Sequence, residues 1–207
     1  MMYAYPDAVI MVFCKAPIPG QVKTRLIPAL TSEEAAQLHC ELTELTLHTA
    51  TQKRLCEVQL WCSPRIDHPF FYPLSQRYSI ARQLQQGEDL GNRMHHAFVE
   101  ALTHFNSAII IGCDCPSLTS DDLEQALIRL NQDAQCVLAP AEDGGYVLIG
   151  LKQPQPTLFE NMPWGSDQVL RQTLTRIQSL NLVAYELNTQ WDLDTIDDLK
   201  RYRHENV

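Results

Sequence analysis

Short apolar runs alternate with longer amphipathic stretches along most of the chain. The first run, AVIMVFC at residues 8–14, is continuous and rich in β-branched side chains, which is typical of a strand buried on both faces. After a loop, Thr31 and Glu34 form a capping box, and apolar residues then recur at three- and four-residue steps as far as Thr49. The pattern therefore predicts a strand, a loop and a long helix, in that order.

The same alternation continues through the rest of the sequence. Further strands are expected at residues 57–62, 108–113, 134–140, 145–151 and 182–187, and further helices at residues 90–105, 119–130, 167–180 and 195–202. Repeated strand–helix alternation predicts an α/β, Rossmann-like fold, with a mainly parallel sheet covered by helices on both faces. No internal repeat, low-complexity stretch or linker interrupts it, so we expect a single domain over residues 1–207.

The composition changes this picture little. At 45% hydrophobic and 20% charged residues, and with no apolar run approaching the roughly eighteen residues of a membrane span, the chain is expected to be a soluble protein. Seven cysteines without a CxxC pair make a poor disulfide framework and a poor zinc site, which indicates reduced thiols and a cytoplasmic location. We interpret the cysteines as core residues, and the histidines, which form no H-E-x-x-H pattern, as structural or solvent-exposed.

Charge is distributed unevenly along the chain. The formal net charge is −9, from 16 Lys+Arg and 25 Asp+Glu, which argues against a nucleic-acid or anionic-membrane partner. Residues 8–32 nevertheless contain no carboxylate and hold Lys15, Lys23 and Arg25. A cationic segment in an acidic chain indicates a small anionic ligand.

That cationic segment directly follows the first expected strand, and ligands in such sheets bind beyond the carboxyl ends of the strands. Gly20 allows close backbone approach, while Lys15, Lys23 and the planar fork of Arg25 suit phosphate oxygens. The segment contains neither GxxxxGK[ST] nor GxGxxG, so it is not one of the common phosphate loops. The alternative is a solvated basic loop.

Acidic residues follow two other expected strands. Asp114 emerges from the most apolar strand, where a carboxylate can meet a divalent cation that also holds nucleotide phosphates. Asp192 and Asp194 alternate before the last helix and are candidates for the same metal. The alternatives are that Asp114 caps a turn and that Asp194 or Thr195 caps the helix.

A glycine turn joins two of the expected strands. Glu142 or Asp143 could supply a catalytic base or an acceptor contact, and Gly144 and Gly145 let backbone amides approach a substrate. The alternative is a plain hairpin, because Asp-Gly is a common turn signal. Trp164 lies beside another glycine and either contacts ligand or packs beneath a loop.

Six motifs, in this order, resemble those of the glycosyltransferase-A, or nucleotide-diphospho-sugar transferase, superfamily, specifically its small bacterial glycosyltransferase branch. The motifs occupy residues 13–26, 86–94, 111–118, 142–150, 163–167 and 192–195 and span nearly the whole chain. One departure matters: Asp114 stands alone between Cys113 and Cys115, whereas typical sugar transferases of this fold carry Asp-x-Asp. A single aspartate resembles the nucleotidyltransferases of the superfamily, yet the loop lacks their longer Gly-x-Gly-Thr-Arg signature.

The resemblance implies a role for each motif. The residues expected to meet the donor nucleotide are Lys15, Gly20, Lys23, Thr24 and Arg25 at its phosphates, and Gly87, Leu90, Gly91 and Arg93 near its base and ribose. The metal ligands are expected to be Asp114 and Asp194, with Asp192 beside them. The residues expected to face the acceptor are Asp143, Gly144, Gly145, Tyr146 and Trp164.

Three functions are compatible with these residues. The leading hypothesis is a Mg²⁺- or Mn²⁺-dependent transferase with a nucleotide-sugar donor, in which Asp143 is the catalytic base or acceptor contact. The second is a nucleotidyltransferase that joins an NTP to a small phosphorylated or carboxylated acceptor with release of pyrophosphate. The third is a nucleotide sensor without turnover. The sequence leaves the base, the sugar, the acceptor and the oligomeric state undetermined.

Overall fold

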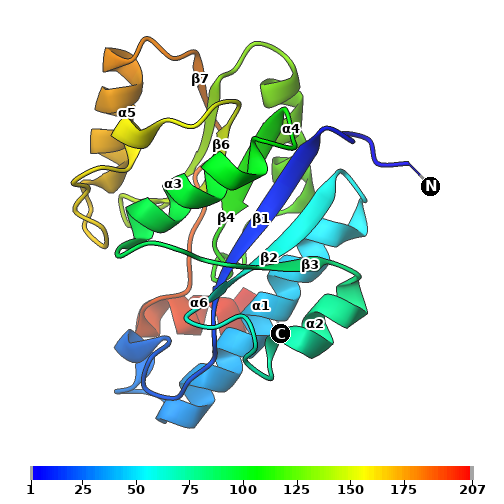
Figure 1. Ribbon diagram of the computed structural model, residues 1–207. Coiled ribbons are helices and arrows are strands. Elements are labelled where there is room, and N and C mark those ends of the chain that lie inside the picture. The colour runs from blue at the N-terminus through cyan, green and yellow to red at the C-terminus, as the bar shows by residue number, and fades with distance from the viewer. Residues whose placement is uncertain (1, 206–207) are drawn as a thin grey trace.

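The computed structural model describes residues 2–205, which form a seven-stranded sheet with helices on both faces (Figure 1). The strands are β1 Ala8–Lys15, β2 Glu57–Ser63, β3 Ala81–Leu84, β4 Ser107–Ile111, β5 Cys136–Pro140, β6 Tyr146–Leu151 and β7 Ala184–Glu186. Their order is β3-β2-β1-β4-β6-β5-β7, and only β6 among them is antiparallel to its neighbours. A short turn returns β5 directly into β6, which requires this antiparallel pairing. The predicted mainly parallel α/β sheet is confirmed.

Two layers of helices bury the sheet. The helices are α1 Ser32–Gln52, α2 Phe71–Tyr78, α3 Leu90–Ala101, α4 Ser120–Asn131, α5 Val169–Ser179 and α6 Ile196–Glu205, with short 3₁₀ helices η1 Thr24–Leu26 and η2 Pro156–Leu158. Alternate residues of β1 point to opposite faces, so Ile10 packs with the α1, α2 and α4 side while Met11 packs with the α3 and α5 side. A third cluster joins α6 to α1 through Leu42, Leu193 and Leu199.

The sequence pattern missed two elements, α2 and β3. Helix α2 is short and carries Pro73 in its first turn, where a proline is tolerated because that N–H lacks a helical partner. Strand β3 is a four-residue edge strand with no fully buried residue, so it lacks an apolar signature. The predicted helix over 90–105 ends at Ala101 and the strand over 108–113 ends at Ile111, which leaves Gly112 and Asp114 in the loop beyond β4.

The chain direction fixes where the sheet is open to ligands. From β1 the chain moves to β2 and β3 on one side, then returns through α3 to β4 on the other side of β1. The loops after β1 and β4 therefore diverge, and such a switch point forms a crevice at the carboxyl ends of the strands.

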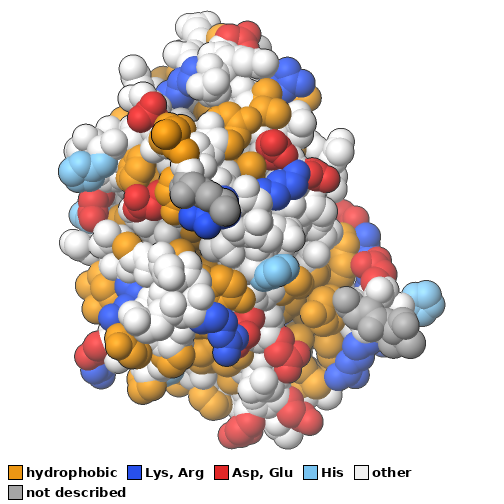
Figure 2. Space-filling view, turned by 90° about the vertical axis from the view of Figure 1, so that its right-hand side faces the viewer, with side chains coloured by type: hydrophobic (Ala, Val, Ile, Leu, Met, Phe, Trp, Pro, Cys, Tyr) orange, Lys and Arg blue, Asp and Glu red, His pale blue; other side chains and the backbone are white. Residues whose placement is uncertain are grey.

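Three further features of the whole structure are its lack of a membrane-spanning helix among the described residues, its free cysteines and the mixed charge of its surface. Among residues 2–205, no helix is both long and apolar enough to cross a bilayer. In the same part of the chain, no disulfide joins any of the seven cysteines. On the face shown in Figure 2, basic and acidic side chains are interspersed.

Candidate active site

A cavity of about 470 Å³ opens beyond the carboxyl ends of β1 and β4. Its charged lining residues are Lys15, Lys23, Arg25, Asp114, Asp143, Asp192 and Asp194. Its large apolar and aromatic lining residues are Phe13, Val22, Leu90, Met94, Ile110, Tyr146, Val147, Ile149, Trp164 and Val169. Apolar walls with a few converging polar groups are the usual composition of a small-molecule site.

Lys23 lies at the centre of the charged lining. It precedes η1 with a left-handed φ of 48°, and its side chain is only 4% exposed. Its ammonium Nζ donates to Oδ1 of Asp194 at 2.9 Å and to Oδ2 of Asp114 at 3.2 Å. Burial opposes the charge, but the two carboxylates outweigh burial and raise the pKa of Lys23 above its usual value. Lys23 is therefore a fixed positive charge between two carboxylates.

The three aspartates expected to hold a metal all line the cavity. The N–H of Leu193 donates to the carbonyl of Asp114 at 2.8 Å, so the segment before α6 runs beside the loop after β4. Gly112 leaves room for the Asp114 carboxylate, because a Cβ there would lie 2.8 Å from Oδ1. Burial, together with Asp143, Asp114 and Asp194, raises the pKa of Asp192 to about 7. The charged lining thus carries a surplus of negative charge.

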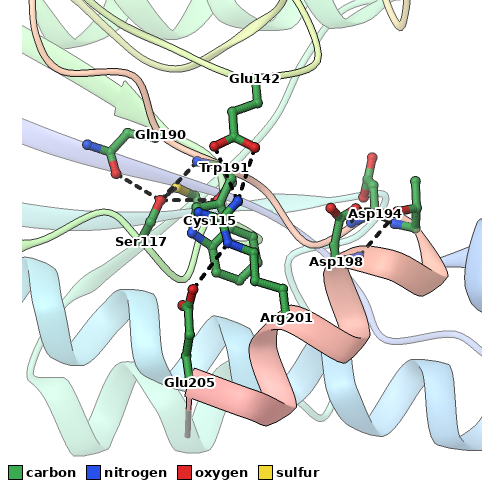
Figure 3. Close-up of polar contacts among 10 residues, drawn as sticks. Cys115, Ser117, Glu142, Gln190, Trp191, Asp194, Asp198, Arg201 and Glu205 are labelled. Carbon is green, nitrogen blue, oxygen red and sulfur yellow. Dashed lines mark hydrogen bonds and ion pairs between the residues drawn. The ribbon is translucent and has the colours of Figure 1, made fainter.

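Ser117 holds the segment that carries these aspartates (Figure 3). Its hydroxyl accepts from the N–H of Trp191 at 2.9 Å and donates to Oε1 of Gln190 at 2.8 Å. The Asp198 carboxylate then accepts from the N–H of Thr195 at 2.7 Å, at the start of α6. Asp194 is therefore fixed on both sides by short polar contacts.

Arg201 on α6 completes this support. Its guanidinium donates from Nη1 to both carboxylate oxygens of Glu142, at 3.0 and 3.2 Å, and lies 4.3 Å over the ring of Trp191 (Figure 3). Glu142, one of two candidate base residues in its motif, thus binds α6, whereas Asp143 lines the cavity. The sequence signalled neither the Arg201 contact nor that of Ser117, because both join segments distant along the chain.

The glycine turn projects Asp143 toward the cavity. Oδ1 of Asp143 accepts from the N–H of Gly145 at 2.8 Å. Gly144 has φ +89°, and a Cβ there would lie 2.3 Å from the carbonyl oxygen of Asp167, so only glycine fits. The turn is therefore fixed against the segment before α5.

Two aromatic residues lie beside that turn. Tyr146 and Trp164 are in edge contact, with centroids 6.4 Å apart, and both line the cavity. Among the described residues, the Tyr146 hydroxyl and the Trp164 Nε1 have no hydrogen-bond partner and are buried. A buried indole N–H at a cavity wall is a donor that a ligand can satisfy.

The residues expected near the base and ribose divide into two groups. Leu90 lines the cavity. Gly91 is buried, and a Cβ added there would lie 2.9 Å from Trp164 Nε1, so the absence of a side chain lets Trp164 pack on α3. Arg93 donates from Nε to the carbonyl of Gly87 at 3.0 Å, which fixes the loop before α3. Of the phosphate-loop residues, Lys15, Lys23, Thr24 and Arg25 line the cavity, whereas Gly20, with φ +77°, lies in an exposed part of the loop.

The cavity lining also includes residues that the sequence indicated only as core or structural. Cys14, His39 and Cys113 line it and are themselves buried. A hydrogen bond from Cys14 and the nearby His39 lower the pKa of Cys113 despite its burial. Cys14 and Cys113 are neighbours because β1 and β4 pair in parallel register, Val12 opposite Ile111. That pairing is a property of the sheet order, so spacing along the sequence gave no signal.

A family model described as "Uncharacterized protein conserved in bacteria (DUF2064)" matches residues 46–166, more than half of the chain. The chain belongs to the DUF2064 family. A comparison with curated proteins finds no match. The matched region contains Asp114, the glycine turn and Trp164, while the phosphate loop and Asp194 lie on either side of it.

Solved structures confirm the resemblance to nucleotide-diphospho-sugar transferases for this member of the DUF2064 family. A protein of Desulfovibrio desulfuricans G20 described as a "putative nucleotide-diphospho-sugar transferase" superposes with TM-score 0.88 at 28% identity, covering 97% of this chain and 88% of its own. The inositol-1-phosphate CTP transferase of T. maritima gives TM-score 0.62 at 9% identity, over 99% and 96%. Glucosyl-3-phosphoglycerate synthase of Mycobacterium tuberculosis, in complex with Mn²⁺ and UDP, gives 0.53 at 8%, over 90% and 71%. The last two share the fold.

Proposed function

We propose that this DUF2064 protein is a divalent-metal-dependent transferase that uses a nucleotide-sugar donor. The observation that carries the proposal is the contact of Lys23 with Asp114 and Asp194 in one cavity at the switch point of the sheet. These groups come from the three segments that the sequence marks for phosphate and metal binding. The similarity to the Desulfovibrio protein supports the same assignment. We further infer that residues 1–207 act as one cytoplasmic domain on small-molecule substrates.

The donor set fits Mg²⁺ or Mn²⁺. Carboxylate oxygens are the ligands that these hard cations prefer, and the Lys23 ammonium already marks a position where Asp114 and Asp194 accept a positive charge. Burial and the nearby Asp143, Asp114 and Asp194 raise the pKa of Asp192, so a bound cation would also lessen the repulsion at this residue. Asp114 and Asp194 would hold the ion, with Asp192 beside them. When bound, the ion supplies charge neutralisation for the leaving diphosphate.

The chain's own cations would bind and orient the donor. Arg25 reaches the cavity with a 63% exposed side chain and lies 3.7 Å from Asp194, so its guanidinium can turn toward phosphate oxygens. Lys15 and Thr24 line the same wall. Lys23 stays with the carboxylates and limits their repulsion, which is a positioning role rather than the direct phosphate contact expected from the sequence.

Asp143 is the candidate base or acceptor contact. In glycosyl transfer the bond between the sugar's anomeric carbon and the diphosphate breaks, a bond to an acceptor oxygen forms, and the acceptor proton needs a receiver. The Asp143 carboxylate is at the cavity wall and is oriented by the Gly145 N–H. The rings of Trp164 and Tyr146, which are in edge contact and line the same cavity, would pack against the acceptor.

A nucleotidyltransferase is the second candidate. The observation that favours it is the single aspartate of the loop after β4, because Asp114 is flanked by buried cysteines that leave one carboxylate there. In that reaction an oxygen of a phosphorylated or carboxylated acceptor attacks the α-phosphorus of an NTP and pyrophosphate leaves, with positioning and charge neutralisation as the main contributions. Both reactions use the same charged lining.

Thermal-shift measurements test the proposal, with a panel of NTPs and nucleotide sugars that are each added with Mg²⁺ or Mn²⁺. Product analysis follows for each ligand that stabilises the protein. Stabilisation by a nucleotide sugar with release of the nucleoside diphosphate supports the glycosyl reaction, and pyrophosphate release from an NTP supports the second candidate. Stabilisation without any product points to a sensor. The matched variants are Asp114→Asn and Arg25→Ala against Lys53→Met, whose ion pairs are on the surface. If no nucleotide shifts the melting temperature of the wild-type protein, and Asp114→Asn and Arg25→Ala behave like the wild type, a nucleotide site is refuted.

A further inference from the structure

Three potential metal ligands converge on the α1 side of the sheet, next to the loop that carries Asp114. Cys14 comes from the end of β1, His39 from α1 and Cys113 from the loop after β4, and all three are buried. One ligand atom from each lies within 4.8 Å of the others, and Cys14 Sγ is 3.7 Å from His39 Nε2. None of the roles proposed above uses them.

A fourth donor completes the group. The carbonyl oxygen of Lys15 lies 3.2 Å from Cys14 Sγ and 2.9 Å from His39 Nε2. Two sulfurs and one imidazole nitrogen therefore lie close together, with a carbonyl oxygen next to two of them. Because Cys14, His39 and Cys113 also line the cavity, an ion has a path to them from solvent.

We propose that Cys14, His39 and Cys113, with the Lys15 carbonyl, form a binding site for Zn²⁺ that is separate from the carboxylate site. Zn²⁺ holds thiolate at about 2.3 Å and imidazole at about 2.0 Å in a tetrahedron, which sets those two ligand atoms roughly 3.5 Å apart. The 3.7 Å between Cys14 Sγ and His39 Nε2 matches that spacing, so small movements suffice.

Charge balance also favours this ion. On binding, both thiols release their protons to solvent and His39 coordinates through Nε2 with its proton on Nδ1, so two thiolates neutralise the divalent cation. A neutral complex is compatible with a buried site, where an isolated charge would be costly. The hydrogen bond between His39 Nε2 and the Lys15 carbonyl oxygen is lost on ion binding, and the nitrogen and the oxygen each coordinate the ion instead.

Donor chemistry keeps the two cation sites apart. Soft sulfur and imidazole ligands select Zn²⁺, whereas the carboxylate oxygens of Asp114 and Asp194 select Mg²⁺ or Mn²⁺. Zn²⁺ at this site would join the end of β1 to the loop after β4 through Cys113, the residue before Asp114. It would thus fix the distance between the phosphate loop and Asp114.

Cobalt substitution tests the proposal on the reduced full-length chain. Co²⁺ titration is expected to give a thiolate-to-cobalt charge-transfer band that saturates at one ion per chain and is displaced by Zn²⁺; carboxylate ligands alone do not give such a band. Cys14→Ser and Cys113→Ser are expected to abolish the band, and His39→Gln to weaken Zn²⁺ binding by at least about tenfold. Cys115→Ser is the matched control, because Cys115 flanks Asp114 on its other side and contacts Ser117.

Three results overturn the proposal. The first is the absence of the charge-transfer band in the wild-type chain at stoichiometric Co²⁺, which requires no variant to fold. The second is equal loss of the band in Cys115→Ser and Cys113→Ser, with circular dichroism confirming that both variants are folded. Formation of a Cys14–Cys113 disulfide in place of ion uptake by freshly reduced protein also counts against it.

Discussion

Lys23 and Asp194 form an ion pair of 2.9 Å although they lie 171 positions apart in the sequence. The same ammonium contacts Asp114, so one side chain joins the loop after β1, the loop after β4 and the segment before α6. Removing this charge would leave two carboxylates facing each other at the cavity wall. The ion pair is therefore both a structural link and part of the proposed metal site.

Replacing Lys23 by Met is expected to lower the free energy of unfolding by about 1–3 kcal/mol, because the carboxylates of Asp114 and Asp194 lose their counter-charge but remain 38% and 36% exposed to screening water. Urea unfolding in the presence of a chelator measures the loss, and added Mn²⁺ should restore part of it. Lys53→Met is the control, since Lys53 also joins two acids but does so on the surface. Equal effects of the two substitutions would contradict the role of Lys23.

The stability of the metal-free protein should fall as pH rises from about 4 to about 7 through the contribution of Asp192. Its pKa in the folded chain is about 7, whereas an unfolded aspartate titrates near 4, so in this window only the folded chain holds the proton. Asp192→Asn removes the contribution. The variant should therefore become progressively more stable than the wild type as pH rises, when urea midpoints are compared in the presence of a chelator. A constant difference across this window is the contrary outcome.

Gly144→Ala and Gly165→Ala separate backbone strain from steric overlap. Both glycines have left-handed backbones, with φ +89° and +81°, and alanine there costs about 1–2 kcal/mol. At Gly144 the added Cβ would also meet the backbone of Asp167, whereas nothing lies within 4 Å at Gly165, so Gly144→Ala should cost roughly 1–3 kcal/mol more. Chemical denaturation gives the unfolding free energy of both variants. Similar losses of stability would show that the turn at Gly144 shifts to make room for the Cβ at little cost.

Arg201→Ala should weaken Mn²⁺ binding by about tenfold without unfolding the chain, because Arg201 positions the segment that carries Asp194 and does not contact the ion itself. Calorimetric titration gives the affinity. Arg203→Ala, an exposed position on the same helix, is the matched control. An unchanged affinity in Arg201→Ala would mean that Ser117 and Asp198 hold the segment alone.

Local patterns explain how much of the fold could be predicted. The strand ending at Lys15 and the helix capped by Thr31 have strong local signals, whereas α2 and β3 are short and lie at the edge of the sheet. The rule that ligands bind beyond the carboxyl ends of the strands also placed Asp114 and the loop that holds Lys23 at the same end of the sheet.

The partners of individual side chains could not be predicted in the same way. That Lys23 meets Asp194, that Glu142 binds Arg201 and that Cys14 adjoins Cys113 all depend on the spatial order of the strands. Residue spacing does not encode that order, because each contact joins segments that are distant in the chain. Sequence motifs thus located the candidate site, and the fold determined which of its charges neutralise one another.

The contacts of Ser117 and Arg201 with the segment around Trp191 also bear on truncation of the protein. Lys23 and Asp114 precede residue 190, whereas Asp194 and Arg201 follow it. A fragment that stops before residue 190 lacks the carboxylate that pairs with Lys23, and it lacks the helix whose arginine binds Glu142. The charged lining of the cavity is therefore completed only when this segment docks against the loop after β4.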